Sequence, residues 1–188
     1  MRPPFLFMPH TRNVFLIGPM GSGKTAVGKH LARSLGMVFH DSDVEIERRT
    51  GVDIPFIFEK EGEAGFRERE RDVIDALTRL ENVVLATGGG AVLMSENRER
   101  LVRRGRVVYL NTGIEQQLHR TRHGRQRPLL YTADPEAKLR ELMASRAPLY
   151  ESIAAIVVRT DGRHVRTVAE EILVKLKGPS LDVAAGSP

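Results

Sequence analysis

Residues 14–25 read VFLIGPMGSGKT, and this stretch decides the fold. Its first four residues form a compact apolar run, which predicts a buried β-strand. The next eight, Gly18-Pro-Met-Gly-Ser-Gly-Lys-Thr25, have the glycine, lysine and threonine spacing of a phosphate-binding loop. Apolar residues then recur every four positions from Val27 to Leu35, and Gly36 follows, which predicts an amphipathic helix with a glycine C-cap. A strand, a glycine loop and a helix in this order predict a nucleoside triphosphate site.

The residue types of this loop suit a triphosphate and its metal ion. Glycines let successive backbone N–H groups turn toward the β-phosphate, and the N-terminus of the following helix adds positive potential. Lys24 reaches the β- and γ-phosphates as a point charge, and the hydroxyl of Thr25 ligates Mg²⁺. The alternative is a glycine-rich turn that is followed by Lys-Thr by chance. This alternative requires that both the motif and the strand and helix around it arose by coincidence. The loop leaves the phosphate acceptor open.

Outside this stretch, apolar runs alternate with amphipathic segments along the chain. Further strands are predicted at 37–40, 83–86, 107–110 and 153–158. Helices are predicted from Ser42 to Gly51 with a Ser42–Glu45 capping box, over 64–80, 96–104 and 114–122, from Pro135 to about Ala147, and over 165–176. This pattern predicts an α/β three-layer sandwich, a five-stranded parallel sheet with helices on both faces. No linker or repeat divides the chain, so we expect one domain over 1–188 with its folded core at about 13–176.

The composition excludes several classes of protein. With 41% apolar residues, the 188-residue chain is not wholly disordered and can bury a sizeable core. It has no cysteine, which excludes a disulfide scaffold and a zinc site with thiolate ligands. No apolar run approaches the roughly 20 residues that span a bilayer, and the N-terminus lacks a signal-peptide pattern. We therefore expect a soluble, cytoplasmic protein without a membrane partner.

The basic excess admits two interpretations. Lys and Arg total 29 against 24 Asp and Glu, and 23 of the basic residues are arginine. Five arginines between positions 98 and 106 make a non-catalytic, nucleotide-dependent RNA-binding module the alternative from a different class. Glu96 and Glu99 alternate with these arginines, however, and only 5% of the residues are aromatic, which favours a solvated helix face. We expect no nucleic-acid partner.

Two carboxylates follow the second predicted strand, in Asp41-Ser-Asp43. The carboxyl ends of strands in an open α/β sheet form the rim where ligands bind, and the phosphate loop lies on the same rim. We expect these two carboxylates to lie on one extended segment and to point to opposite sides, so that one faces the metal and the other a second ligand. The alternative is that Asp43 only caps the next helix.

Two further features suit an anionic or hydroxylated ligand. Arg67 lies on a charged helix, where it can bind a ligand or simply pair with Glu63 or Glu70 on the surface. The run Gly88-Gly-Gly90 follows a buried strand, and three glycines allow the backbone to approach a ligand closely and to present N–H groups to it. A plain flexible turn is the alternative for this run.

Together these motifs resemble the shikimate kinases, P-loop kinases related to the nucleoside monophosphate kinases. The likeness runs from about residue 13 to 176, and the Phe-Arg, triple-glycine and Arg-Pro-Leu-Leu elements make it specific. The elements that carry it are Gly18-Pro-Met-Gly-Ser-Gly-Lys-Thr-Ala-Val-Gly28, Asp41-Ser-Asp43, the string Gly51, Ile54, Ile57-Phe58, Gly62-Glu63, Phe66-Arg67 and Glu70, Val84-Leu-Ala-Thr-Gly-Gly-Gly90, Arg127-Pro-Leu-Leu130 and Arg146-Ala-Pro-Leu-Tyr150.

The resemblance implies a strand order of 2-3-1-4-5 and transfer of the γ-phosphate of ATP to the 3-hydroxyl of shikimate, in chorismate and aromatic amino-acid biosynthesis. It implies that Asp43 is the candidate base and holds the ring hydroxyls, that Arg67 and Arg146 clamp the carboxylate, and that Gly88, Gly89 and Gly90 contact the ring side. It further implies that Thr25, with Asp41 through water, holds Mg²⁺, and that Lys24 and Arg127 act on the transferring phosphate. The residues that it implies to contact ATP are Gly21, Ser22, Gly23, Lys24, Thr25, Ala26, Arg120, Arg127 and Arg163.

Three points qualify these implications. The third strand ends Ala86-Thr87-Gly88 without an acidic residue, so the metal role falls to Asp41. Arg163 lies in a segment that lacks the proline often found in the family, and a solvated turn is the alternative there. The basic stretch 123–134 has the composition of a mobile lid, with an ordinary surface loop as its alternative. Gluconate kinase is the nearest enzymatic rival, and a monomer with ATP and shikimate as its partners is expected.

Overall fold

Strand β1 (Val14–Ile17) lies at the centre of a five-stranded sheet in the computed structural model, which describes residues 13–121 and 132–177. The other strands are β2 (Val38–Asp41), β3 (Val83–Ala86), β4 (Arg106–Asn111) and β5 (Ile156–Arg159). All pairings are parallel, and Phe15 of β1 lies opposite Leu85 of β3 and Val107 of β4. The order β2-β3-β1-β4-β5 confirms the predicted one.

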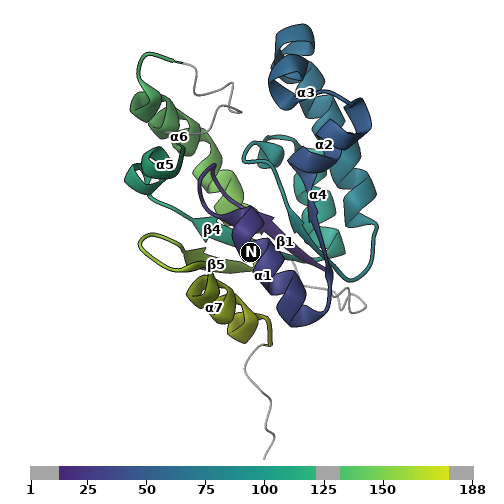
Figure 1. Ribbon diagram of the computed structural model, residues 1–188, viewed down its shortest axis with the longest axis vertical. Coiled ribbons are helices and arrows are strands. Elements are labelled where there is room, and N and C mark those ends of the chain that lie inside the picture. Colours follow the sequence, from purple (N-terminus) through teal and green to yellow (C-terminus); the bar gives the residue numbers. More distant parts are fainter. Residues whose placement is uncertain (1–12, 122–131, 178–188) are drawn as a thin grey trace, which may run out of the picture.

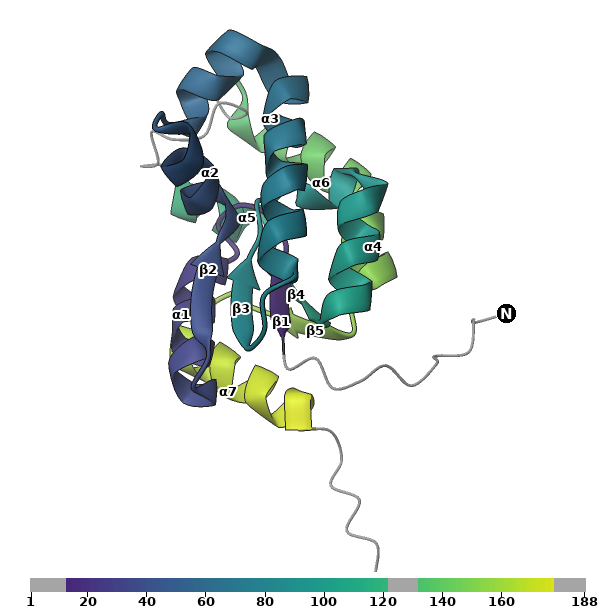
Figure 2. The ribbon, with the colours of Figure 1, turned by 90° about the vertical axis from the view of Figure 1, so that its right-hand side faces the viewer.

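Helices cover both faces of this sheet (Figures 1 and 2). Val14 and Leu16 point to the face covered by α1 (Lys24–Leu35) and α7 (Val165–Lys177). Phe15 and Ile17 point to the other face, where α3 (Ile54–Thr78), α4 (Ser95–Arg104) and α6 (Pro135–Ile153) pack. The remaining helical segments are α2 (Ser42–Thr50), the 3-10 turn η1 (Ala91–Leu93) and α5 (Ile114–Thr121). Because both faces are covered, every residue of β1 and β3 is buried, whereas Val38 on the edge strand β2 is 59% exposed.

Two helix boundaries differ from the prediction. Helix α3 begins at Ile54 instead of residue 64, because the side chain of Asp53 accepts a hydrogen bond from the Phe56 N–H and caps the helix there. A kink at Gly62, where φ is 69°, joins its two parts and interrupts the apolar period. Helix α6 continues through Pro148 to Ile153, so the fifth strand begins at Ile156 and not at 153. Burial of Tyr150 in the core stabilises this last turn against the proline.

The cap of α2 also differs from the prediction. The capping residue is Asp41, whose Oδ1 accepts a hydrogen bond from the Asp43 N–H at 3.1 Å. Ser42 is the first helical residue, and its hydroxyl accepts a hydrogen bond from the Gly88 N–H at 2.9 Å instead of forming a box with Glu45. The loop after β3 is thereby joined to the start of α2.

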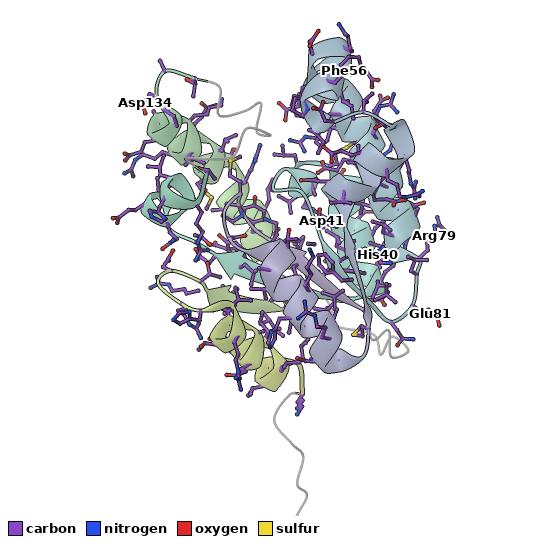
Figure 3. All side chains as sticks on the ribbon, in the orientation of Figure 1. His40, Asp41, Phe56, Arg79, Glu81 and Asp134 are labelled. Atoms are coloured by element: carbon purple, nitrogen blue, oxygen red, sulfur yellow. The ribbon has the colours of Figure 1, made fainter. Side chains whose placement is uncertain are left out.

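Some predictions fall outside the described residues. These are the N-terminal arm, the C-terminal tail and most of the 123–134 lid, including Arg127. Within residues 13–121 and 132–177, no helix is both long enough and apolar enough to span a membrane. Figure 3 shows Asp41 near the middle of the molecule, below Phe56, with Asp134 at the upper left.

Candidate active site

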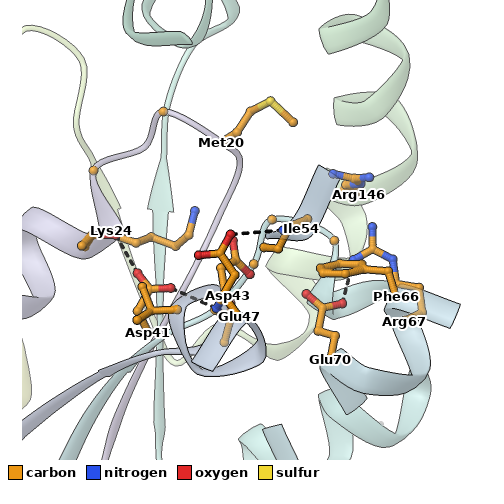
Figure 4. Close-up of a pocket in the computed structure, with 18 of the residues that line it drawn as sticks. Met20, Lys24, Asp41, Asp43, Glu47, Ile54, Phe66, Arg67, Glu70 and Arg146 are labelled. Carbon is orange, nitrogen blue, oxygen red and sulfur yellow. Dashed lines mark hydrogen bonds and ion pairs between the residues drawn. The ribbon is translucent and has the colours of Figure 1, made fainter. Parts of the chain in front are cut away.

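A cavity of about 550 Å³ opens at the carboxyl ends of β1, β2 and β3. The phosphate loop and the start of α1 line one side of it, and α2, α3 and Arg146 of α6 line the other (Figure 4). The triple-glycine run Gly88–Gly90 forms part of the wall between them. Parallel strands bring these distant segments to one rim, as the rule for open α/β sheets predicts.

The phosphate loop wraps around the N-terminus of α1. Its turns need glycine, because Gly18, Gly21 and Gly23 have φ values of 140°, 75° and 90°, where a side chain is strained. The Nζ of Lys24 donates to the carbonyls of Gly18 and Pro19 at 2.8 Å each, so the ammonium group lies across the loop. The predicted nucleotide residues that line the cavity are Gly21, Gly23, Lys24, Thr25 and Ala26, while Ser22 is buried beneath the loop with its hydroxyl 3.2 Å from the Lys24 Nζ.

Thr25 and Asp41 provide adjacent oxygen atoms on the cavity wall. The Thr25 hydroxyl donates to the Oδ2 of Asp41 at 2.8 Å. Among the described residues, no group of three or more His, Cys, Asp or Glu side chains could hold a metal ion by itself. A hydroxyl and a carboxylate fit Mg²⁺, which takes one or two protein ligands and completes its shell with phosphate and water. Zinc or a transition metal would need a richer set of ligands.

Asp43 lies in the first turn of α2, so the prediction that it shares an extended segment with Asp41 is wrong. Both carboxylates nevertheless line the cavity. Burial, together with the negative charges of Glu70 and Asp41, raises the pKa of Asp43 to about 7 against the opposing effect of Lys24 and Arg67. This carboxylate is therefore poised to accept a proton near neutral pH.

Arg67 combines the two interpretations that the sequence left open. It lines the cavity, and it also pairs with Glu63 at 2.8 Å and with Glu70 at 2.6 Å. Glu70 is fully buried, its other oxygen Oε1 has no hydrogen-bond partner among the described residues, and burial raises its pKa against the attraction of Arg67. The pair fixes the guanidinium of Arg67 at the cavity wall.

Arg146 comes from α6 and is only 4% exposed. Its Nε has no hydrogen-bond partner among the described residues, and burial lowers the pKa of its guanidinium. Nearby Arg67 lowers this pKa as well, because the two positive charges repel each other. Two guanidiniums that line one cavity form a site for an anion, and their planar forks suit a carboxylate.

The triple-glycine run is a crowded part of the wall and not a free turn. A Cβ at Gly88 would lie 2.4 Å from the Oε1 of Glu70 and 2.8 Å from the Oδ1 of Asp43. At Gly90 it would lie 2.2 Å from the Nη2 of Arg67. Glycine is required here because the backbone passes directly beside the charged groups of the site.

The other predicted nucleotide arginines have different positions. Arg120 of α5 lines the cavity and donates from Nη1 to the carbonyl of Gly21 at 2.9 Å. Arg163 pairs with Glu171 of α7 at 2.6 Å and donates to the carbonyl of Arg159, and it is not among the described residues that line the cavity. This position agrees better with the alternative of a surface turn.

Sequence reasoning missed part of the lining. Glu47 lies on the cavity wall, and its Oε1 accepts a hydrogen bond from the Ile54 N–H at 3.1 Å, which joins α2 to α3. Ile54 and Phe58 also line the cavity, and the ring of Phe58 lies 4.8 Å from that of Phe66. Ile54 and Phe58 belong to the motifs that carry the family resemblance, but the sequence assigned no role to either. Their position at the cavity was not predicted, because the helix was expected to begin only at residue 64. The apolar pair Ile57-Phe58 was the available signal.

Comparison with known proteins agrees with this geometry. The shikimate kinase family model matches residues 20–177. The chain belongs to the shikimate kinase family. A shikimate kinase from Pseudomonas syringae pv. tomato is 57% identical over 165 residues, which make up 88% of this chain and 96% of that relative.

Solved structures agree with this shikimate kinase fold. A shikimate kinase from Acinetobacter baumannii in complex with shikimate is 52% identical and has a TM-score of 0.89, with 90% of this chain and 95% of that chain covered. A gluconokinase from Sinorhizobium meliloti 1021 is 18% identical and has a TM-score of 0.55, with 89% and 92% covered. The second likeness concerns the fold alone.

Proposed function

We propose that this shikimate kinase family member transfers the γ-phosphoryl group of ATP to the 3-hydroxyl of shikimate, giving shikimate 3-phosphate and ADP for chorismate and aromatic amino-acid biosynthesis. The observation that carries the proposal is Arg146, a buried guanidinium on the same cavity as the phosphate loop whose Nε lacks a hydrogen-bond partner among the described residues. A cation buried in this way needs an anionic ligand, and shikimate supplies a carboxylate.

On the donor side, the N–H groups of the phosphate loop and the Lys24 ammonium bind the β- and γ-phosphates. Lys24 leaves the loop carbonyls of Gly18 and Pro19 for the phosphates when ATP arrives. Thr25 and Asp41 would hold Mg²⁺, which would supply positive charge to neutralise the phosphates. Arg120 contacts the nucleotide beside the loop, and Arg127 completes the charge neutralisation from the lid.

On the acceptor side, Arg67 and Arg146 hold the carboxylate of shikimate, and the Gly88–Gly90 backbone contacts the ring. Asp43 accepts the proton of the 3-hydroxyl as its oxygen bonds to the γ-phosphorus, while the bond from this phosphorus to the bridging oxygen breaks and ADP leaves. The pKa of about 7 for Asp43 suits this role, because a base is most effective when its pKa is close to the working pH.

The alternatives make different demands on the site. A gluconate kinase would also need a carboxylate site, but its likeness to this chain is one of fold alone. An RNA-binding module would not need the buried Arg146 and the neighbouring Arg67 on the same cavity as the phosphate loop. We therefore infer a monomeric, cytoplasmic enzyme whose partners are ATP and shikimate, and not a nucleic acid.

A coupled assay of ADP release tests this function. With ATP and Mg²⁺, the purified chain should turn over shikimate, and gluconate or a nucleoside monophosphate should give at most background rates. Removal of Mg²⁺ by EDTA should stop turnover. ADP release with gluconate or a nucleoside monophosphate but not with shikimate would contradict the proposal.

A matched pair of arginine variants tests the acceptor site. Arg67→Ala should raise the KM for shikimate roughly 100-fold, because one of the two carboxylate contacts is lost. Arg69→Ala is the control, since Arg69 lies on the same helix but pairs with the exposed Glu61 and does not line the cavity. An unchanged KM in Arg67→Ala would refute the carboxylate clamp.

A further inference from the structure

Tyr150 is a fully buried residue of α6 that follows Arg146 by one helical turn. Its hydroxyl donates a hydrogen bond to the carbonyl of Gly89 in the triple-glycine run. Its ring stacks on that of Tyr109 of β4, with ring centroids 5.0 Å apart. The helix that carries Arg146 therefore also contacts the triple-glycine run in the cavity wall.

Gly89 is the glycine at which the acceptor wall meets the phosphate loop. A Cβ at this position would lie 3.4 Å from the Met20 N and 3.5 Å from the Gly18 carbonyl oxygen. The neighbouring Gly88 is held from another side, by the Ser42 hydroxyl at 2.9 Å. The contact with Tyr150 thus holds the one residue of the run that packs against the donor site.

The Tyr150 hydrogen bond also sets the direction of the next N–H group. The structure has no cis peptide bond among its described residues, so the Gly90 N–H points opposite to the Gly89 carbonyl and away from Tyr150. No described residue accepts a hydrogen bond from the Gly90 N–H. Gly90 lines the cavity beside the guanidinium of Arg67, where a donor would suit an anionic ligand.

We propose that Tyr150 is a positioning residue for acceptor binding, which fixes the Gly89–Gly90 peptide so that its N–H faces the acceptor and Gly89 stays against the phosphate loop. This inference rests on the proposed function. It assigns to Tyr150 a role beyond core packing, because loss of the hydroxyl would free the peptide to rotate while the ring and its stacking remained.

The Tyr150→Phe variant tests this role. The KM for shikimate should rise about five- to tenfold, while kcat and the KM for ATP stay within about twofold of the wild type. Because the Tyr150 hydroxyl also interacts with the Arg146 guanidinium, the Gly90 amide signal described below separates the effect on the loop from an effect on Arg146. Tyr109→Phe is the matched control. Tyr109 is equally buried and stacks on the same ring, but its hydroxyl makes no hydrogen bond to any described residue. This control should keep the wild-type KM.

A second measurement follows the loop itself. In ¹⁵N-edited NMR spectra of the full chain, Tyr150→Phe should shift the Gly90 amide signal and reduce its response to added shikimate, and Tyr109→Phe should do neither. A lower melting temperature with an unchanged KM and an unchanged Gly90 signal would overturn the inference and leave Tyr150 a packing residue. If the wild-type enzyme does not phosphorylate shikimate, the proposed function fails instead, and the Gly90 signal still decides whether Tyr150 fixes the loop.

Discussion

Replacing Asp43 by asparagine should stabilise the free protein at alkaline pH while it destroys activity. Asp43 Oδ1 and Glu70 Oε1 both lie beside Gly88, where an added Cβ would be 2.8 Å from the former and 2.4 Å from the latter. Two carboxylates this close in a buried site repel each other, and burial adds to the cost of ionisation. Asparagine keeps the shape of the side chain and removes one of the two charges.

The size of the effect follows from the pKa. The pKa of about 7 in the folded protein exceeds the ordinary aspartate pKa of 3.8, so between these two pH values the folded state binds a proton that the unfolded state has lost. Stability from this group is therefore present below pH 4 and is lost as the pH rises to 7. The full difference between the two pKa values corresponds to about 4 kcal/mol of unfolding free energy. About half of this free energy should remain after relaxation of the site and entry of water.

The assay is thermal unfolding of wild type and variants without nucleotide at pH 4.5 and pH 8. Asp43→Asn should raise the melting temperature at pH 8 by roughly 4–8 °C and at pH 4.5 by less than about 2 °C. Asp72→Asn is the control for net charge, because Asp72 is exposed and pairs with Arg71 on the surface, and its effect should be small at both pH values.

The same variant should lose catalysis. Without the base, kcat for shikimate should fall by about 10²–10⁴-fold. In the wild type, kcat/KM should rise with pH through about 7 as Asp43 ionises. The reasoning is refuted if Asp43→Asn is no more stable than wild type at pH 8, or if its effect is equal at the two pH values.

Three other variants test separate parts of the site. Lys24→Ala should lower kcat by at least about 10³-fold through loss of charge stabilisation in the transition state, with the shikimate affinity measured by calorimetry unchanged. Arg146→Met should raise the KM for shikimate roughly 100-fold and leave the melting temperature equal or higher. The stability should not fall, because an apolar chain replaces a buried guanidinium whose Nε has no partner among the described residues, and a large loss of stability would contradict this. Gly28→Ala should lower the unfolding free energy by about 1–3 kcal/mol, because the new Cβ would lie 2.4 Å from the Phe39 Cε2. Urea titrations measure this change, and an unchanged stability would show that α1 and β2 pack less closely than described.

The donor half of the site was predictable from local sequence. The run from Val14 to Thr25 contains a strand, its glycine turns and the start of a helix, and each follows from short-range rules. The strand order came from the family resemblance and not from periodicity, because neighbours in a sheet such as β1 and β3 are far apart along the chain.

The acceptor half depends on tertiary contacts that a local pattern does not contain. The position of Asp43 follows from the cap at Asp41, and the start of α3 follows from the cap at Asp53, whereas the charged sequence around Gly62 has no clear apolar period. Tyr150 lies beyond Pro148, where local rules end the helix, so its contact with Gly89 is visible only in the folded structure.

A crystal structure of the enzyme with ADP, Mg²⁺ and shikimate tests the central claim most directly. The account predicts that the shikimate carboxylate lies within about 3 Å of both Arg67 and Arg146, with the 3-hydroxyl next to Asp43 and directed at the phosphate loop. A carboxylate bound away from Arg146, or a 3-hydroxyl directed away from Asp43, would contradict it.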